Sequence, residues 1–397
     1  MKNVGLFISE MNSGGAERVV SRLSKILEND YNIYVVLFED TYMEYECGGK
    51  IVNMNLPAGG GILNKVFLLL KRVRALKRIK KEYSLDCVIS FLDSPNIVNI
   101  LSGGSCKNIV SIRNYTKKEN SRSVLGKLTD IFIKKLYQKA DVIVPVSKVI
   151  AKSYETDYAV PEEKLKVIYN PYDVGEIHDR MKEPAEDEIK AFSDGKTVFV
   201  SVGRIMHQKG FWHLIKAFGE VRKHDENARL LIIGENIIGD EPQKLAEGLG
   251  IKDSVMFTGK VKNPFKYLAL SDVYVLSSLF EGFPNGMTEA MVCGLPIIAT
   301  DCKSGPREIL NKTPDFGREY TDVTECDFGI LVPELEDEEN WSAKEPLTDS
   351  ERTLAKAMLM LGSDGSKRAD FAAKALNRGA DFNYDACKKA YASIIDG

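Results

Sequence analysis

At residues 280–299 the chain reads FEGFPNGMTEAMVCGLPIIA, a glycine- and proline-rich loop followed by a helix and then an apolar strand. An apolar run at 272–277 precedes the loop, so the stretch completes a strand–loop–helix–strand unit. Strands that alternate with helices are typical of right-handed crossovers in a parallel sheet. The loop after the carboxyl end of such a strand faces the ligand crevice. The stretch therefore predicts both the fold class and the position of a binding site.

The same alternation of strands and helices extends over most of the chain. In the second half we expect strands at 197–203, 228–234 and 254–258, a polar loop at 314–327, and helices at 348–362 and 366–394. In the first half we expect strands at 4–9, 33–39, 51–56, 86–92, 108–112, 141–146 and 166–169, and helices at 15–28, 62–82, 121–139 and 149–158. The turn at Asn170-Pro171 and the acidic stretch 176–194 predict an interdomain linker. We therefore predict an α/β protein with two Rossmann-like domains, 1–170 and 171–375, whose parallel sheets face each other across a cleft. A final helix at 376–397 is expected to pack back on the first domain.

The overall composition indicates a soluble cytoplasmic protein. Of the 397 residues, 44% are hydrophobic and 28% are charged, as in ordinary globular proteins. No run approaches the roughly 20 apolar residues that span a bilayer, and the apolar N-terminal run is too short for a signal peptide. Seven scattered cysteines without a C-x-x-C pair disfavour a disulfide framework or a zinc site. Residues 1–170 carry 26 Lys/Arg against 18 Asp/Glu, an excess that suggests an anionic partner for this half.

The stretch at 280–299 also supplies groups that bind sugars and phosphates. Glu281 lies in the loop, and Glu289 lies about a turn and a half inside the helix. Carboxylates suit sugar and ribose hydroxyls because charge-assisted hydrogen bonds are strong. The helix begins at Asn285, Gly286 and Met287, whose N–H groups attract phosphate.

Two cations follow the strand predicted at 197–203. Gly203 and Arg204 end this strand, and Lys209 comes five residues after Arg204, just before the next helix. Both cations can neutralise the charge that grows on a departing diphosphate.

The first half offers weaker candidates at two strand ends. Gly14 and Gly15 join the first strand to the first helix; glycines there let the backbone approach a phosphate, although a simple tight turn explains them equally well. Arg113 and Asn114 follow the strand at 108–112 and are expected to face the cleft. The alternative for Arg113 is an ordinary surface arginine.

Taken together, these motifs resemble the signature of the family-four retaining glycosyltransferases of the GT-B fold. The resemblance rests on the stretch 280–299, on Gly203-Arg204 with Lys209-Gly210, on the Gly14-Gly15 loop and on Ile168-Tyr169-Asn170-Pro171. It implies transfer of a hexose-type sugar from a nucleotide diphosphate donor, expected to be a UDP-sugar, to a glycan or lipid-linked acceptor in polysaccharide assembly.

The resemblance also implies roles for the individual residues. Glu281, Arg204 and Lys209 become the catalytic residues, with Glu281 on donor hydroxyls and the two cations on the diphosphate. The implied substrate contacts are Gly14, Gly15, Arg113, Asn114, Gly203, Phe283, Pro284, Asn285, Gly286, Met287 and Glu289. The first domain becomes the acceptor side and the second binds the nucleotide sugar.

The chain departs from the family in the first domain. Many members place a histidine there near the reacting centre, whereas all four histidines of this chain follow residue 171. Arg113-Asn114 resembles a subgroup with polysaccharide-assembly roles. The absence of an Asp-x-Asp pair at a strand end predicts that no metal or other cofactor is bound, and no nucleic acid partner is expected. A nucleotide-sugar epimerase, a sugar phosphorylase and an inactive subunit that stabilises a partner stay open as alternatives.

The predicted helix at 62–82 carries eight lysines and arginines among leucines, valines and isoleucines. Such a helix can lie on an anionic membrane surface, on the inner face for a cytoplasmic protein. An amphipathic core helix with a solvated basic face explains the same pattern.

Overall fold

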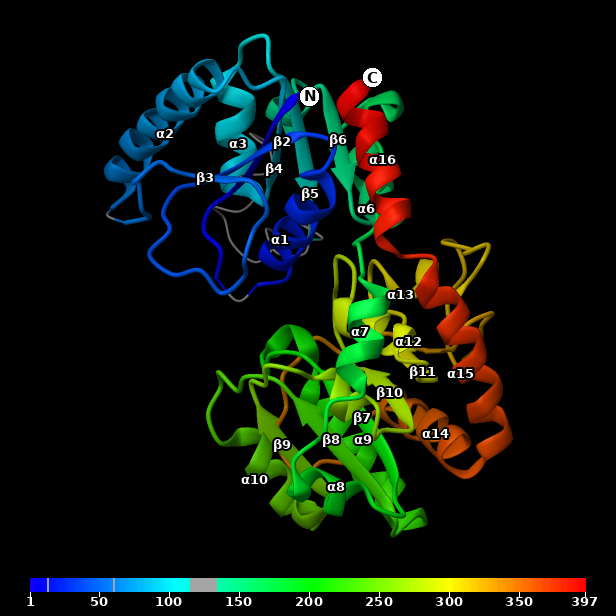
Figure 1. Cartoon of the computed structure of the whole chain (residues 1–397). Helices are drawn as coiled ribbons and strands as arrows, with labels where there is room; N and C mark the ends of the chain where they lie inside the picture. The colour runs from blue at the N-terminus through cyan, green and yellow to red at the C-terminus, as the bar shows by residue number, and fades with distance from the viewer. Residues whose placement is uncertain (13, 60, 115–133) are drawn as a thin grey trace. The chain divides into compact units, whose positions relative to one another are not determined.

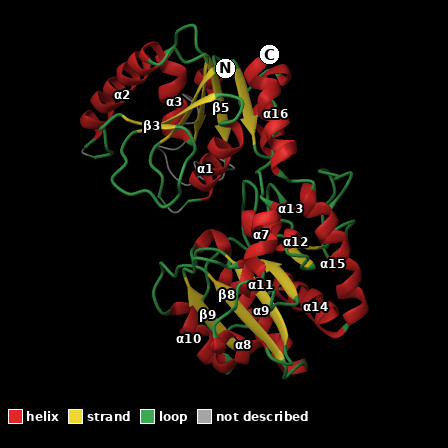
Figure 2. Cartoon of the chain, viewed as in Figure 1, coloured by secondary structure: helices red, strands yellow, loops and turns green. Residues whose placement is uncertain are grey.

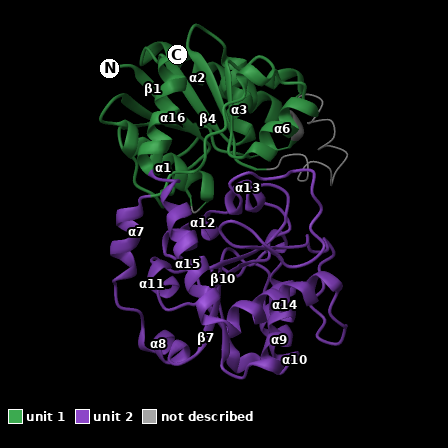
Figure 3. Ribbon diagram, turned by 90° about the vertical axis from the view of Figure 1, so that its right-hand side faces the viewer, with its two compact units in different colours: residues 1–172, 384–397 green, residues 173–383 purple. Residues whose placement is uncertain are grey.

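The computed structural model describes residues 1–12, 14–59, 61–114 and 134–397. The chain divides into two compact units, shown in different colours in Figure 3. Unit 1 comprises Met1–Tyr172 together with Tyr384–Gly397, and unit 2 comprises Asp173–Asn383. Both units are parallel α/β structures, which confirms the predicted fold class.

Unit 1 is built on a six-stranded parallel sheet. Its strands are β1 (Asn3–Ile8), β2 (Asn32–Leu37), β3 (Lys50–Asn53), β4 (Cys87–Phe91), β5 (Lys107–Ile112) and β6 (Val142–Pro145). They lie in the order β3-β2-β1-β4-β5-β6, and every neighbouring pair is parallel. The order reverses between β1 and β4, which makes this edge the topological switch point where ligands of such sheets bind.

Helices cover both faces of this sheet (Figures 1 and 2). Val4, Leu6 and Ile8 of β1 pack into one cluster with α1 (Gly15–Leu27) and α16 (Tyr384–Asp396). Phe7, which points to the opposite side, packs with α2 (Ile62–Glu82) and α3 (Asp93–Ser102). The alternation follows from the two-residue period of a strand, and it buries both faces as a parallel sheet requires. The unit also contains α6 (Lys148–Thr156).

The C-terminal helix α16 belongs to unit 1, although it follows the whole of unit 2 in the sequence. Cys387, Tyr391, Ile394 and Ile395 are buried in the unit 1 core. Polar contacts fasten both ends of α16, since Lys388 pairs with Asp30 at 2.6 Å and Lys2 Nζ donates to the carbonyl of Ile395 at 3.0 Å. The preceding helix, α15 (Gly365–Ala380), lies in unit 2. The helix predicted to run through 366–394 is therefore two helices, separated at residues 381–383.

The first five strands of unit 2 repeat the order of the first five strands of unit 1. Its strands are β7 (Thr197–Val202), β8 (Ala228–Ile233), β9 (Val255–Gly259), β10 (Val273–Leu276), β11 (Ile297–Thr300), β12 (Thr324–Glu325) and β13 (Ile330–Val332). They are ordered β12-β13-β11-β10-β7-β8-β9. The pair β12–β13 is antiparallel, whereas the other pairs are parallel. The order reverses between β7 and β10, so the loops after these two strands meet at the switch point of unit 2.

Helices also cover the sheet of unit 2 (Figure 1). The core on one face combines β7, β8 and β10 with α9 (Phe211–His224), α10 (Glu241–Gly248) and α14 (Asp349–Ser363). Helix α12 (Asn285–Val292) belongs to a second group of elements. It contacts α15, α7 (Val174–Met181) and the strands β7, β10 and β11. The remaining helices are α8 (Asp187–Ser193), α11 (Phe265–Leu268) and α13 (Pro306–Leu310).

Several local predictions were wrong. The stretch 166–169 is not a strand: Lys166 and Ile168 donate to the carbonyls of Ile143 and Pro145, but Pro145 has no N–H with which to return a bond. The acidic stretch at 176–194 is not a linker, because α7 and α8 occupy it. Helix α3 and the strand β13 were missed, and the polar loop at 314–327 contains β12. The helix predicted at 121–139 falls largely outside the described residues, of which Lys134–Tyr137 are helical.

Candidate functional site

Two loops meet at the switch point of unit 2. The loop after β7 runs from Gly203 to Gly210, and the loop after β10 runs from Ser277 to Pro284. Backbone and side-chain contacts join them, since Leu279 N donates to the carbonyl of Gln208 at 2.8 Å and Gln208 Nε2 donates to that of Phe280 at 2.8 Å. The predicted Lys209 and Glu281 are thereby held by one continuous framework.

Lys209 and Glu281 form an ion pair at the centre of these loops. Lys209 Nζ lies 2.6 Å from Glu281 Oε1, which also accepts a hydrogen bond from Ser278 Oγ at 2.7 Å. The Glu281 side chain is 7% exposed and that of Lys209 is 21% exposed, so the pair lies at the edge of the protein interior. Among the described residues, no donor reaches Glu281 Oε2. That oxygen can still accept a hydrogen bond from a ligand hydroxyl.

The backbone of Lys209 is fixed by its neighbours in both loops. Ser277 Oγ donates to the carbonyl of Lys209 at 2.8 Å. Gly210 has φ +58°, and a Cβ atom there would lie 2.3 Å from the carbonyl oxygen of Ser277. A left-handed residue this close to another strand end has to be glycine. The Lys-Gly pair of the sequence is therefore needed for the ammonium to lie beside Glu281.

Arg204 is the second cation of this site and differs from Lys209 in its surroundings. It follows β7, is exposed, and makes no hydrogen bond or ion pair with the part of the chain that the structure describes. A guanidinium without a protein partner can bind an anionic group with paired N–H donors.

The N-terminus of α12 contributes backbone rather than side chains. Phe283 and Met287, predicted as substrate contacts, are 5% and 0% exposed, and the Phe283 ring packs on Phe382 with 5.4 Å between ring centroids. Their side chains thus hold the loop and helix in place. Pro284 precedes the helix, while Asn285 and Gly286 are partly exposed in its first turn. N–H groups at this end can bind an anion.

Glu289 lies within α12, further from the loop than Asn285, and its side chain is only 2% exposed. Burial raises the pKa of the Tyr274 phenol, and the carboxylates of Glu281 and Glu289 raise it further. Burial and Glu289 likewise raise the pKa of the Cys293 thiol. The two glutamates of the sequence motif therefore act on the same neighbourhood, around Tyr274 of β10.

In unit 1, Gly14 and Gly15 lie after β1, at the switch point of that sheet. Gly14 is the residue before α1, and Gly15 opens the helix. A Cβ at Gly14 would lie 1.9 Å from Glu17 Oε2. The glycine thus lets the Glu17 side chain fold back over the start of the helix.

Arg113, by contrast, does not lie on the surface. It is 8% exposed, and its guanidinium donates to Asn170 Oδ1 and, at 3.3 Å, to Ser111 Oγ. Burial lowers its pKa, and the neighbouring Tyr391 comes from α16. The surface alternative is wrong, because the side chain is buried beside Tyr391 of α16, whereas the role of Arg113 as a substrate contact stays a prediction. The next residue, Asn114, is exposed.

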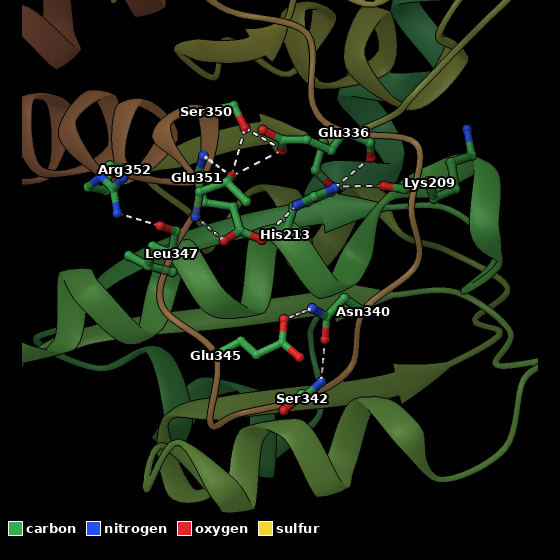
Figure 4. Close-up of polar contacts among 12 residues, drawn as sticks. Lys209, His213, Glu336, Asn340, Ser342, Glu345, Leu347, Ser350, Glu351 and Arg352 are labelled. Carbon is green, nitrogen blue, oxygen red and sulfur yellow. Dashed lines mark hydrogen bonds and ion pairs between the residues drawn. The ribbon is translucent and has the colours of Figure 1, made fainter.

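A buried network beside Lys209 was missed by the sequence analysis (Figure 4). His213 of α9 lies 2.7 Å from Glu351 Oε1 of α14 through Nδ1, and its Nε2 lies 2.9 Å from the carbonyl of Glu336. Since a carbonyl only accepts, Nε2 carries a hydrogen. Glu351 also closes a capping box with Thr348 at the start of α14. This network fixes the first turn of α9, directly after Lys209.

The Thr348-x-x-Glu351 spacing was the available sequence signal for this network, because a capping box can be read from the sequence. The long-range partner, His213, could not be inferred from spacing. Among the described residues, no group of three or more His, Cys, Asp or Glu side chains is arranged to hold a metal ion. No helix in the described ranges is long and apolar enough to cross a membrane.

Comparisons with known proteins match this chain to glycosyltransferases. Residues 182–314 match the family described as Glycosyl transferases group 1, and residues 13–176 match Glycosyltransferase Family 4. An uncharacterized glycosyltransferase of Methanocaldococcus jannaschii is 29% identical over 96% of this chain and 95% of its own length. The N-acetylgalactosamine-N,N'-diacetylbacillosaminyl-diphospho-undecaprenol 4-alpha-N-acetylgalactosaminyltransferase of Campylobacter jejuni is 29% identical over 84% of this chain and 86% of its own.

The fold is shared with solved structures. HepE from Anabaena, in complex with UDP and glucose, matches with a TM-score of 0.74 and 17% identity over 100% of both chains. A sucrose-phosphate synthase from Thermosynechococcus elongatus matches with a TM-score of 0.76 and 16% identity, over 100% of this chain and 98% of its own.

Proposed function

We propose that this chain, which belongs to the family 4 glycosyltransferases, moves a hexose-type sugar from a UDP-sugar to a glycan or lipid-linked acceptor in polysaccharide assembly. The observation that carries the proposal is the Lys209–Glu281 pair at the switch point of unit 2, beside the N-terminus of α12. The names of two matches support the finer assignment. The Campylobacter relative acts on a diphospho-undecaprenol glycan, and the Anabaena structure holds UDP and glucose.

Each group of the site suits one part of such a donor. Glu281 Oε2 accepts from sugar hydroxyls, while Glu289 is assigned to the ribose. Lys209, Arg204 and the first N–H groups of α12 bind the diphosphate, because cations and helix N-termini both attract phosphate oxygens. Gly203, next to Arg204, keeps the strand end open to the donor.

The proposed acceptor contacts lie in unit 1. Gly14, Gly15 and Asn114 stand at the carboxyl edge of the unit 1 sheet. Arg113 supports this edge from inside through Asn170 rather than by reaching the acceptor itself.

The proposed reaction needs no protein nucleophile. The bond between the anomeric carbon and the diphosphate oxygen breaks, and the acceptor hydroxyl oxygen bonds to the same carbon on the same face, so the configuration is retained. The acceptor proton passes to an oxygen of the leaving diphosphate. Lys209 and Arg204 neutralise the charge that grows on this leaving group. Glu281 is held by Lys209 and Ser278 and serves to orient the sugar.

A ligand screen followed by a transfer assay tests this proposal. A nucleotide that binds the native chain at 100 times its Kd stabilises it by about 2.7 kcal/mol. We expect UDP-sugars to raise the melting temperature of the wild type and to raise it less in Lys209→Gln. The stabilising sugar is then offered together with lipid-diphosphate glycans. Stabilisation without transfer or donor hydrolysis would favour an inactive subunit, and stabilisation by no nucleotide sugar would remove the donor assignment.

A further inference from the structure

The turn that carries Lys209 is held by hydrogen bonds from two sides. On one side it contacts the loop after β10, through Lys209 itself and the residue before it. On the other side, His207 Nε2 lies 2.8 Å from the carbonyl of Asp337, and His213 Nε2 lies 2.9 Å from that of Glu336. Both ring nitrogens donate, because a carbonyl oxygen only accepts. Two consecutive carbonyls of the segment after β13 thus bind the histidines that precede and follow Lys209.

His213 and Glu351 form a buried pair that has no net charge. The two residues are 2% and 1% exposed, and His213 Nδ1 lies 2.7 Å from Glu351 Oε1 (Figure 4). The other carboxylate oxygen accepts the N–H of Thr348 at 2.9 Å. Because Nε2 already donates to Glu336 and two acceptors cannot bond to each other, one proton lies between Nδ1 and Oε1. The pair is therefore neutral as a whole and avoids the desolvation cost of a lone buried charge.

The indole of Trp212 packs against both histidines. Its ring centroid lies 5.3 Å from that of His207 and 4.9 Å from that of His213. Trp341, which follows the bound carbonyls in the sequence, lies 5.7 Å from the same indole in an edge-on arrangement. Trp212 is fully buried, so packing and hydrogen bonds restrain the two imidazoles together. The turn from 207 to 213 is therefore a rigid support for Lys209.

We propose that His213 and Glu351 are positioning residues, which act through Lys209 on the leaving diphosphate. The inference rests on the proposed function, in which the Lys209 ammonium neutralises that group. Both residues are too deeply buried to touch a ligand. His213 N, however, donates to the carbonyl of Gly210 at 3.1 Å, so the network reaches the residue next to Lys209. A displacement of about 1 Å can cost about 100-fold in rate, and the network keeps the ammonium at 2.6 Å from Glu281 Oε1.

The hydrogen-bond pattern predicts which substitutions keep the network. In Glu351→Gln, the amide oxygen can accept from Thr348 N, and the amide nitrogen can donate to Nδ1 of a neutral His213. Glutamine is also a regular residue at this position of a capping box. In His213→Gln, the amide can donate to the carbonyl of Glu336, but the buried Glu351 loses its partner. We therefore expect Glu351→Gln to transfer at the wild-type rate and His213→Gln to lower kcat by about tenfold.

A double-mutant cycle with Lys209→Gln separates positioning from a general loss of stability. If His213 acts through Lys209, His213→Gln should lower kcat by about tenfold in the wild type and hardly at all in Lys209→Gln. A weakened fold would lower kcat by the same factor in both backgrounds. Transfer is measured at saturating donor and well below each variant's melting temperature. The matched control is His224→Gln, which changes an exposed histidine of the same helix, 3.4 Å from Glu220, and should behave as the wild type does.

The outcomes distinguish failure of the positioning role from failure of the proposed function. If Lys209→Gln is slow and His213→Gln slows it further by the same factor as in the wild type, the positioning role is wrong and the role of Lys209 stands. If Lys209→Gln transfers at the wild-type rate, the role of Lys209 is wrong and the positioning role falls with it. A Glu351→Gln variant as slow as His213→Gln would also overturn the positioning role, because its hydrogen bonds would be complete and Lys209 would still be misplaced.

Discussion

In the part of unit 1 that the structure describes, three cations are buried, whereas in unit 2 the two cations of the candidate site stay within reach of solvent. Arg72, Lys80 and Arg113 are each at most 8% exposed and donate to carbonyl or amide oxygens of unit 1. Arg204 is exposed, and Lys209 pairs with Glu281 at the edge of the interior. The positive excess of the first half of the sequence is therefore not one surface feature. Part of it supports the fold, and part of it lies on α2.

The partners of these cations explain the difference. A buried cation that donates to neutral oxygens has no N–H group left to bind a ligand. Burial also lowers the pKa of Lys80 to about 8. Lys209 instead faces a carboxylate, and its three ammonium hydrogens are not all used by the protein. A cation that has to bind a diphosphate needs such remaining donors. In the proposed function, the same residue type thus serves stability in unit 1 and ligand binding in unit 2.

The largest effect is expected from removing the carboxylate of the unit 2 site. Glu281→Ala should lower kcat/KM by about 10²–10³-fold or more, as the loss of a preorganised contact to the reacting substrate does. The fold should persist, because Lys209 is partly exposed and can be solvated. Turnover and melting temperature are measured together, and Ser193→Ala, away from the loops, serves as control. Near wild-type turnover in Glu281→Ala would show that Glu281 is not a catalytic residue.

A matched pair of arginine variants tests the comparison directly. Arg113→Met should lower the free energy of unfolding by about 2–3 kcal/mol, since it removes the buried hydrogen bond from the guanidinium to Asn170. Arg204→Met should leave stability unchanged and slow transfer by about 10- to 100-fold, and Lys209→Gln should slow it similarly. Denaturant unfolding and saturating-donor kinetics are run on all three. If Arg113→Met slowed transfer without loss of stability, Arg113 would belong to the site.

A smaller effect should appear as pH dependence of stability. The pKa of Lys80 is about 8 in the folded chain, against 10.5 ordinarily. Between these values the unfolded chain keeps a proton that the folded chain has lost, so Lys80 makes stability rise with pH there, by at most about 1.4 kcal/mol per pH unit. Below pH 8 the lysine is charged in both states, and folding carries the cost of burying that charge. The check is the difference in unfolding free energy between wild type and Lys80→Met across this window. Lys77→Met, an exposed lysine on the same helix, should show no such difference.

The sequence predicted most of the fold because strand and helix periods are local properties. Eleven of the strands, β1 to β11, were predicted, and Glu281, Lys209 and Arg204 follow the carboxyl ends of strands as expected. The pairing of Lys209 with Glu281 was not predicted, because it depends on β7 and β10 being neighbours, which spacing alone does not give. The burial of Arg113 was not predicted for a similar reason. Its environment is completed by Tyr391 of α16, near the far end of the chain.

Removal of divalent metal is the last test, and its expected effect is none. In many transferases a metal ion neutralises the leaving diphosphate. In the proposed site, Arg204, Lys209 and the N-terminus of α12 supply positive charge to the leaving diphosphate, and no Asp-x-Asp pair ends a strand. A metal ion added beside the two cations would be repelled by them and would not increase the rate of transfer. We expect transfer at full rate in excess chelator, with wild-type protein and purified donor.

The informative control is Lys209→Gln, in which the positive charge is reduced and added magnesium should restore part of the lost rate. If chelator abolished wild-type transfer and manganese or magnesium restored it, the cations of unit 2 would not be sufficient to neutralise the leaving diphosphate. A bound metal ion, rather than the exposed cations, would then distinguish unit 2 from unit 1.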